Sequence, residues 1–141
     1  TADRAVITLD TGGILVFKKE KGNWKIDLTI NPTEEERKKA NDTRRVIDLR
    51  GQLRNALELY YSQHEGYPAL SDTSKDGEFL EVLRGFAGNL LDPLHPKYFY
   101  EYEGTKNSYT LKCYCEIEGG DCDMADGVKD HVLTIIFPKI K

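Results

Sequence analysis

The feature that most constrains the fold is a helical pattern about thirty residues long. After Thr33, apolar residues recur every three or four positions and form one stripe, made of Val46, Leu49, Leu53, Ala56, Leu57 and Tyr60. Residues at this spacing share one face of a helix, so the pattern predicts a single amphipathic helix. Such a helix would be roughly 45 Å long. Its apolar stripe has to be buried against another layer of structure.

Both ends of this helix carry local signals. Thr33 and Glu36 have the spacing of a capping box, and acidic residues fill the first turn, where the helix dipole favours them. Gly66 is expected to stop the helix, and Pro68 prevents it from resuming. The face opposite the apolar stripe carries charged residues that we expect in solvent, namely Arg44, Asp48, Arg54 and Glu58.

Three strand-like segments precede the helix, at residues 5–9, 14–18 and 24–30. Glycine-containing turns separate them. In the third segment Trp24, Ile26, Leu28 and Ile30 alternate with polar residues, which is the period of a half-buried strand. We therefore expect residues 1–31 to form a β-meander, either as an extension or as part of the same domain as the rest.

The chain after the helix predicts a short helix around Phe79 to Phe86 and three strands, at residues 98–103, 109–116 and 132–138. Tyr98, Tyr100 and Tyr102 occupy alternate positions and would share one face of the first strand. The fold class that follows is α+β. A long α-helix in the N-terminal half packs on a small antiparallel sheet within residues 32–141, and the β-meander precedes it.

Composition narrows the possible functions. Hydrophobic residues make up 39% of the 141 residues and charged residues 31%, which is typical of one globular domain. The net charge of −4 argues against nucleic acid as a partner, because binding its backbone needs a basic surface. No apolar run approaches the ~20 residues that span a bilayer. We expect membrane contact only through a segment that this chain does not contain.

Several motifs within residues 41–138 occur in the same order as in a known protein family. They are the run Asn41 to Leu49, the stretch Ala56 to Tyr61, Gly66-Tyr67-Pro68, Leu91-Asp92-Pro93 before the tyrosine-rich residues 98–102, and Ser108 to Cys113. Together they resemble the C-terminal half of the long helix and the following sheet of type IV pilins and type II secretion pseudopilins. The very hydrophobic first half of the helix in that family does not appear, and the β-meander stands in its place.

The resemblance implies an exported, non-enzymatic structural or assembly protein, found extracellularly, at the cell surface or in the periplasm. Its partners would be other pilin or pseudopilin subunits or components of a secretion apparatus. One alternative is an extracellular module that binds a ligand or surface on a pilin-like scaffold. A third hypothesis is a hydrolase of the Asp-Thr-Gly type, discussed below.

An acidic, glycine-rich segment separates the last two predicted strands. It contains four aspartates that are candidate calcium ligands, Asp121, Asp123, Asp126 and Asp130. Calcium takes six to eight oxygen ligands, which carboxylates and carbonyls of such a loop supply. The resemblance adds that major pseudopilins bind calcium in a loop of their C-terminal sheet. The alternative is an ordinary polar loop, because the spacing is not that of an EF-hand.

The three cysteines, Cys113, Cys115 and Cys122, lie within ten residues of one another. In an export context Cys122 would pair with one of the other two and leave a single buried thiol. Cys113 and Cys115 are poorly placed to bridge each other, because they lie two positions apart on a predicted strand. A zinc site with His131 as a fourth ligand is the alternative, although the spacing matches no common zinc module.

Asp10-Thr11-Gly12 follows an apolar run, as the catalytic aspartate does in aspartic proteases. Those enzymes need two such aspartates that share a proton, and the sequence contains no second Asp-Thr-Gly. The same residues are also ordinary for a hairpin turn. His64, His95 and His131 are scattered and suggest no triad. We therefore expect no enzyme activity.

Overall fold

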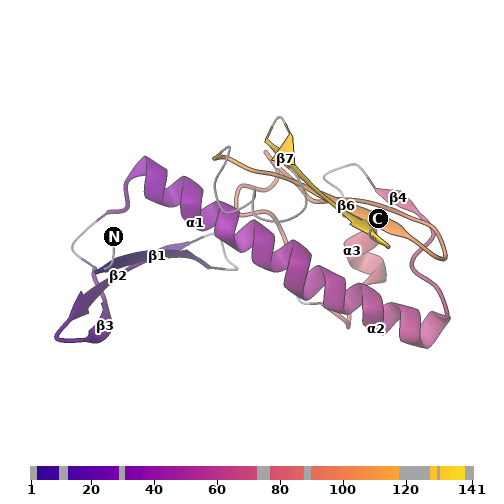
Figure 1. Ribbon diagram of the computed structural model, residues 1–141, viewed down its shortest axis with the longest axis horizontal. Coiled ribbons are helices and arrows are strands. Elements are labelled where there is room, and N and C mark those ends of the chain that lie inside the picture. The colour runs from indigo at the N-terminus through magenta and orange to yellow at the C-terminus, as the bar shows by residue number, and fades with distance from the viewer. Residues whose placement is uncertain are drawn as a thin grey trace.

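The computed structural model describes residues 3–9, 13–28, 31–72, 77–87, 90–117, 128–129 and 131–138. Within these ranges the protein is of mixed α+β class, and one long helix packs against two antiparallel sheets (Figure 1). The mixed class, the long helix and the β-meander before it were predicted from the sequence and are confirmed. No helix in the described ranges has both the length and the apolar character needed to cross a bilayer.

The long helix covers residues 34–64 in three consecutive segments, α1 (Glu34–Ile47), the π-helical turn η1 (Asp48–Leu53) and α2 (Arg54–His64). The predicted capping box is present. The Glu36 N–H donates to Thr33 Oγ1 over 3.1 Å, and the Thr33 N–H donates to Glu36 Oε1 over 2.9 Å. These bonds satisfy two of the N–H groups that a helix start leaves unpaired.

The helix ends at His64, close to the predicted stop at Gly66, but the residue that adopts the left-handed conformation at its end is not the glycine. Glu65 adopts the left-handed conformation, with φ at 56°. Gly66 serves close packing instead, because a Cβ there would lie 2.8 Å from Cγ of Lys106. The Tyr67 N–H donates to the Lys106 carbonyl over 3.0 Å and fixes this approach.

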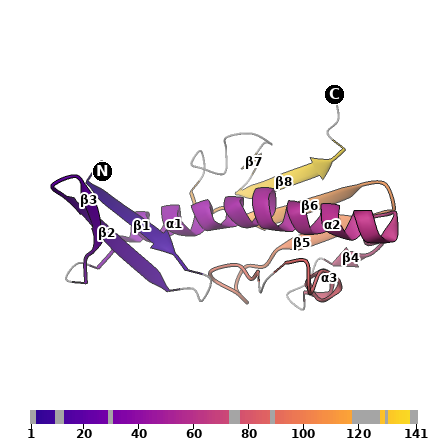
Figure 2. The ribbon, with the colours of Figure 1, turned by 90° about the horizontal axis from the view of Figure 1, so that it is seen from below.

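The N-terminal sheet has the order β1-β2-β3, from strands β1 (Arg4–Thr8), β2 (Ile14–Glu20) and β3 (Asn23–Ile26). One face packs on α1, where Thr8 and Val16 are buried. The predicted half-burial of the third segment is wrong, since Trp24, Ile26 and Leu28 are all exposed. Only one face of this sheet lies against the helix (Figure 2), and the strand pairing places Trp24 and Ile26 on the other face.

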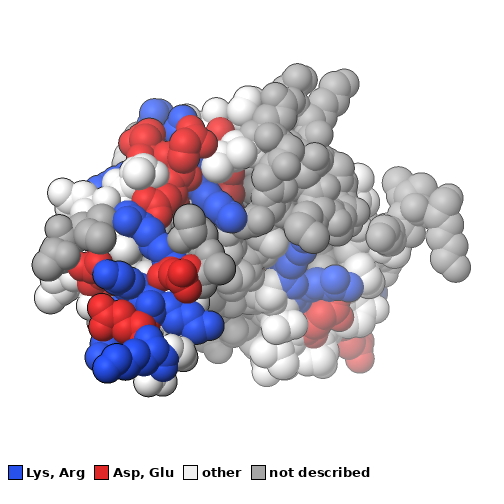
Figure 3. All heavy atoms as spheres, turned by 60° about the vertical axis from the view of Figure 1, so that its left-hand side comes forward, with Lys and Arg blue, Asp and Glu red and all other residues white. Residues whose placement is uncertain are grey.

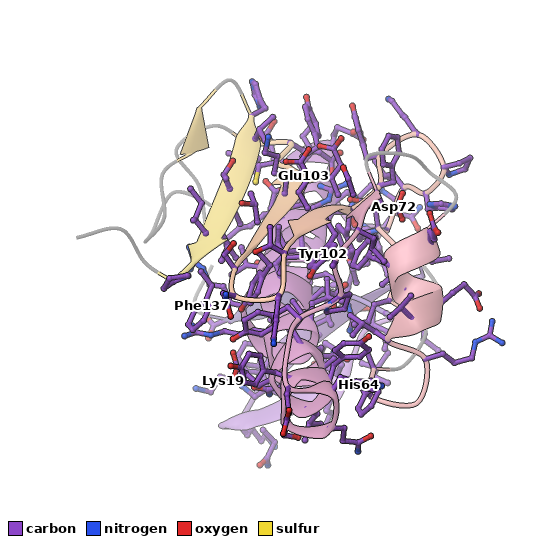
Figure 4. The ribbon with its side chains drawn as sticks, turned by 90° about the vertical axis from the view of Figure 1, so that its right-hand side faces the viewer. Lys19, His64, Asp72, Tyr102, Glu103 and Phe137 are labelled. Atoms are coloured by element: carbon purple, nitrogen blue, oxygen red, sulfur yellow. The ribbon has the colours of Figure 1, made fainter. Side chains whose placement is uncertain are left out.

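The C-terminal sheet has the order β4-β5-β6-β8-β7 and is antiparallel throughout. Its strands are β4 (Ser71–Asp72), β5 (Glu101–Gly104), β6 (Tyr109–Tyr114), β7 (Val128–Lys129) and β8 (Val132–Phe137). The first predicted strand is wrong at its start, because β5 begins at Glu101 rather than at Tyr98. Figure 4 shows Tyr102 pointing between this sheet and the helix, whereas Glu103 points away.

The core lies between the C-terminal sheet and the η1–α2 part of the helix, and α3 (Glu78–Val82) closes one side. Its fully buried apolar side chains include Leu49, Leu53, Leu57, Phe79, Leu83, Tyr102, Leu111 and Leu133. The predicted apolar stripe of the helix therefore supplies its half of the core, as expected from its spacing.

Candidate functional site

The least expected feature of the molecule is a buried arginine in the middle of the long helix. Arg45 has no exposed surface, and its guanidinium faces three carboxylates. Nε and Nη2 donate to the two carboxylate oxygens of Asp92 over 2.7 and 2.9 Å. Nη1 donates to Asp42 over 2.9 Å and to Glu116 over 2.7 Å. The planar guanidinium suits this arrangement because it presents its donors in a rigid fork.

Burial by itself would lower the pKa of the Arg45 guanidinium. Hydrogen bonds and the negative charges of Asp92 and Glu116 outweigh burial, so the pKa is held above its ordinary value. Arg45 is therefore a permanent cation. Its side chain is sealed from solvent and its three nitrogens are all engaged, which leaves no open position for a substrate. These contacts join the helix to the turn at Asp92 and to the end of β6.

Neighbouring polar residues of the same cluster connect the helix to both sheets. Asp42 accepts the N–H groups of Glu116 and Ile117, each over 2.8 Å, at the end of β6. The Asn41 amide donates to Glu116 over 3.0 Å and accepts the hydroxyl proton of Thr8 over 2.8 Å. A continuous polar chain thus runs from the N-terminal sheet through the helix to the C-terminal sheet.

Asp48 extends the polar set by one further helix turn. The prediction that its side chain faces solvent is wrong, because Asp48 is completely buried. It accepts the hydroxyl proton of Tyr100 over 2.7 Å and pairs with Arg44 over 3.0 Å. Burial, followed by the nearby Asp48 charge, raises the pKa of Tyr100 above its ordinary value.

Sequence reasoning missed this cluster, and one signal could have revealed it. Asp42, Arg45 and Asp48 recur every three residues, a spacing that places opposite charges together on one helix face. Such a run is usually a solvated face. Only the tertiary position of Asp92, 47 residues after Arg45, shows that the face is buried.

The sequence predicted one disulfide and one buried free thiol among the three cysteines, and the structure describes two of them. Cys115 is disulfide-bonded, and Cys113 is a free, buried thiol. The candidate partner Cys122 lies outside the described residues. Burial raises the pKa of Cys113 to about 12, so this thiol is unreactive near neutral pH.

The other candidate sites are separated or lie outside the described part of the chain. Asp121, Asp123, Asp126 and Asp130, like Asp10-Thr11-Gly12, belong to segments that the structure does not describe. Among the residues it does describe, no group of three His, Cys, Asp or Glu side chains is placed so that it could hold a metal ion. The histidines are apart: His64 stacks on Tyr60 with ring centroids 4.0 Å apart, and His131 Nδ1 lies 2.9 Å from the Cys115 carbonyl oxygen.

An open groove of about 520 Å³ lies at the far end of the C-terminal sheet. The β5–β6 connection, the segment before β4 and the end of β8 form its walls, with Leu70, Lys106 and Ile136 among the lining residues. It holds one lysine and one glutamate, Glu103, and no paired acid and base. The groove has room for a ligand or for side chains of a partner.

Comparisons with known proteins give no relative. No family model matches the chain, and neither curated proteins nor solved structures match it.

Proposed function

We propose that the chain is an exported, non-enzymatic structural or assembly protein of pilin or pseudopilin type. It would act through protein–protein contacts in a surface filament or secretion apparatus, and its partners would be other subunits or secretion components. The observation that carries the proposal is the single helix of residues 34–64 with one side on an antiparallel sheet. This arrangement fits the element order on which the sequence resemblance rests.

Three further features support an assembly role. The polar chain through Asn41, Asp42 and Glu116 joins the helix to both sheets, which suits a subunit that neighbouring subunits hold in place. The disulfide at Cys115 is typical of proteins that leave the reducing cytosol. The exposed side of the helix carries a large apolar residue, Leu59, that is half exposed and open to a partner.

The groove at the end of the C-terminal sheet favours a second candidate function, an extracellular module that binds a ligand or a surface. Ile136 lines this groove and is 46% exposed, similar to Leu59 on the helix at 52%. The two positions therefore make a matched pair of probes, one for each hypothesis.

A photoreactive amino acid at Leu59 or at Ile136, introduced in the native host, separates the two functions. Assembly predicts a cross-linked species of higher mass from Leu59, containing another subunit of a surface or secretion complex. Cross-links from Ile136 alone would favour the binding module. A chain that gives products at neither position would contradict the assembly proposal.

Calcium binding by Asp121, Asp123, Asp126 and Asp130 stays a prediction. It is tested by thermal unfolding in calcium and in a chelator. A ligand that binds only the folded state raises the midpoint, so equal midpoints would exclude it.

A further inference from the structure

The N-terminal sheet has an outward face that is almost wholly apolar. Paired residues of neighbouring strands point to the same side, so Ile7 shares a face with Leu15, and Phe17 with Ile26. This outward face consists of Ala5, Ile7, Leu15, Phe17, Lys19, Trp24 and Ile26, and Leu9 and Leu28 lie just beyond the ends of β1 and β3. Five apolar side chains on this face or next to it are between 39% and 89% exposed, namely Ile7, Leu9, Trp24, Ile26 and Leu28.

The inner face of the same sheet, which packs on α1, is much less exposed than the outward face. Thr8 and Val16, which point toward α1, are 3% and 5% exposed. Arg4, on the same side, donates to Glu36 over 2.6 and 2.9 Å. Figure 2 shows α1 behind this sheet, with no other described element in front of it.

Strands β1 and β2 have the sequence of a sheet that is covered on both faces. A sheet with one solvated face alternates apolar and polar residues, whereas a doubly covered sheet has continuous apolar runs. Residues 5–7 and 14–17 are such runs, Ala-Val-Ile and Ile-Leu-Val-Phe. Among the described residues only α1 covers this sheet, and it covers one face, so these runs favour a second layer on the other.

We infer that a second copy of this chain supplies that layer, the two outward faces packing together as a six-stranded β-sandwich. Aligned sheets of this kind pack about 10 Å apart, with side chains of both inner faces interleaved. A two-fold axis allows the same patch to serve on both copies. The inference names a partner for the proposed assembly function and rests on it.

Charge and area favour a second copy over other occupants. The face carries a single charge, Lys19, which lies next to the β2–β3 turn with its Nζ 5.8 Å from the Trp24 ring centroid, so the rest of the face holds no like charges that two copies would bring together. Figure 3 shows Lys and Arg mixed with Asp and Glu on the end of the molecule that was on the left in Figure 1, which does not favour an anionic lipid surface. Five exposed side chains of about 100 Å² each would give on the order of 1,000 Å² for the pair, the lower limit for a specific interface.

The chain contains a matched pair of positions and a built-in probe for a test. Ile26 on the outward face is 54% exposed, and Ile47 on the helix is 50% exposed. Trp24, the only tryptophan, lies within the face. The experiment follows sedimentation velocity and Trp24 emission over a range of concentrations for the wild type, Ile26→Lys and Ile47→Lys, and for a milder variant, Ile26→Thr, that keeps a strand-forming residue.

The wild type should dimerise as concentration rises, with a blue shift of Trp24 emission. Ile26→Lys should weaken the dimer at least tenfold, Ile26→Thr should weaken it less, and Ile47→Lys should behave as wild type. Monomers at all concentrations up to 1 mM would overturn the inference, as would equal effects of Ile26→Lys and Ile47→Lys. A blue shift seen only with anionic vesicles would assign the face to lipid. A monomer that still cross-links through Leu59 would refute the dimer and keep the assembly function.

Discussion

Arg45 and Asp92 form a bidentate ion pair in which neither side chain is exposed. The pair joins the middle of the helix to the turn after Leu90 and Leu91, across 47 residues of chain. Desolvation of two charges costs several kcal/mol each, so the net contribution of such a pair to stability is small or even negative. Removal of one partner is strongly destabilising, because the remaining charge stays buried without its partner.

Asp92→Asn should therefore lower the free energy of unfolding by about 3 kcal/mol or more, since Arg45 loses its strongest partner. Urea unfolding followed by circular dichroism measures this. The control is Arg84→Ala, which breaks an exposed pair with Glu81 of similar length, 2.7 Å. That change should cost less than about 1 kcal/mol. Similar losses in both variants would show that the buried pair has no special structural role.

Gly104 is predicted to tolerate no side chain. A Cβ there would collide with the hydroxyl of Tyr102 and lie 2.6 Å from the Pro68 carbonyl oxygen, the group to which Tyr102 donates over 2.8 Å. Gly104→Ala should cost about 2–4 kcal/mol, because the buried Tyr102 hydroxyl loses its partner. Gly51→Ala, in the helix with nothing within 4 Å, should instead stabilise by about 0.5–1 kcal/mol. Thermal unfolding of both variants gives the comparison, and an unaffected Gly104→Ala would contradict the close contact.

The helix and its apolar stripe were predictable because both depend on local spacing. Thr33, Glu36 and Leu49 to Leu57 act through neighbours three or four residues away, so the sequence contains the whole signal. The exposure of Trp24 and Ile26 was not predictable in the same way. Alternation shows that a strand has an apolar face, and only the position of α1 determines which face this chain covers.

The buried charges were missed for a related reason. Burial of Arg45 requires Asp92 and Glu116, which lie 47 and 71 residues further along the chain. Helical periodicity cannot show such partners, and charged residues are seldom fully buried. For Cys113 and Cys115, in contrast, local spacing was informative. Their spacing argued against a mutual bridge, and one is indeed free while the other is bonded.

Three core tyrosines should respond differently to loss of their hydroxyl. Tyr100 donates to Asp48 and Tyr102 to Pro68, so Tyr100→Phe and Tyr102→Phe should each cost about 1–3 kcal/mol. The Tyr109 hydroxyl is buried with no hydrogen-bond partner among the described residues. Tyr109→Phe should be neutral or stabilising, because it removes an unsatisfied polar group. Urea unfolding ranks the three, and a loss at Tyr109 as large as at Tyr100 would indicate a partner for its hydroxyl.

The thiol of Cys113 should be protected until the protein unfolds. It is 2% exposed, and burial raises its pKa to about 12, so little thiolate forms at pH 8. Iodoacetamide should leave Cys113 unlabelled in the native protein and modify it in urea, while Cys115 should be modified only after reduction. Peptide mass spectrometry identifies each site. Labelling of native Cys113 at the rate of a small-molecule thiol would show that the core around it opens readily.

The last prediction concerns acid and the attachment of the N-terminal sheet. The Thr33 N–H, followed by the Arg4 guanidinium, lowers the pKa of Glu36 below its ordinary value. A carboxyl group whose pKa is lower in the folded state stabilises that state fully above its unfolded pKa. This stabilisation is lost as pH falls from about 4.5 through the lower folded value. Acid should thus release Arg4 before the core between α2 and the C-terminal sheet unfolds.

Hydrogen exchange of β1 amides between pH 6 and pH 3, corrected for intrinsic rates, tests this order. Protection of β1 should fall in the wild type while β6 stays protected. Glu36→Gln keeps the hydrogen bond of the capping box but not the charge, so it should show weaker β1 protection already at pH 6 and a smaller change on acidification. Glu35→Gln alters a neighbouring acid that is exposed and should leave the wild-type profile unchanged. If β1 and β6 lose protection together in all three proteins, the Arg4–Glu36 pair is not what holds the N-terminal sheet on the helix.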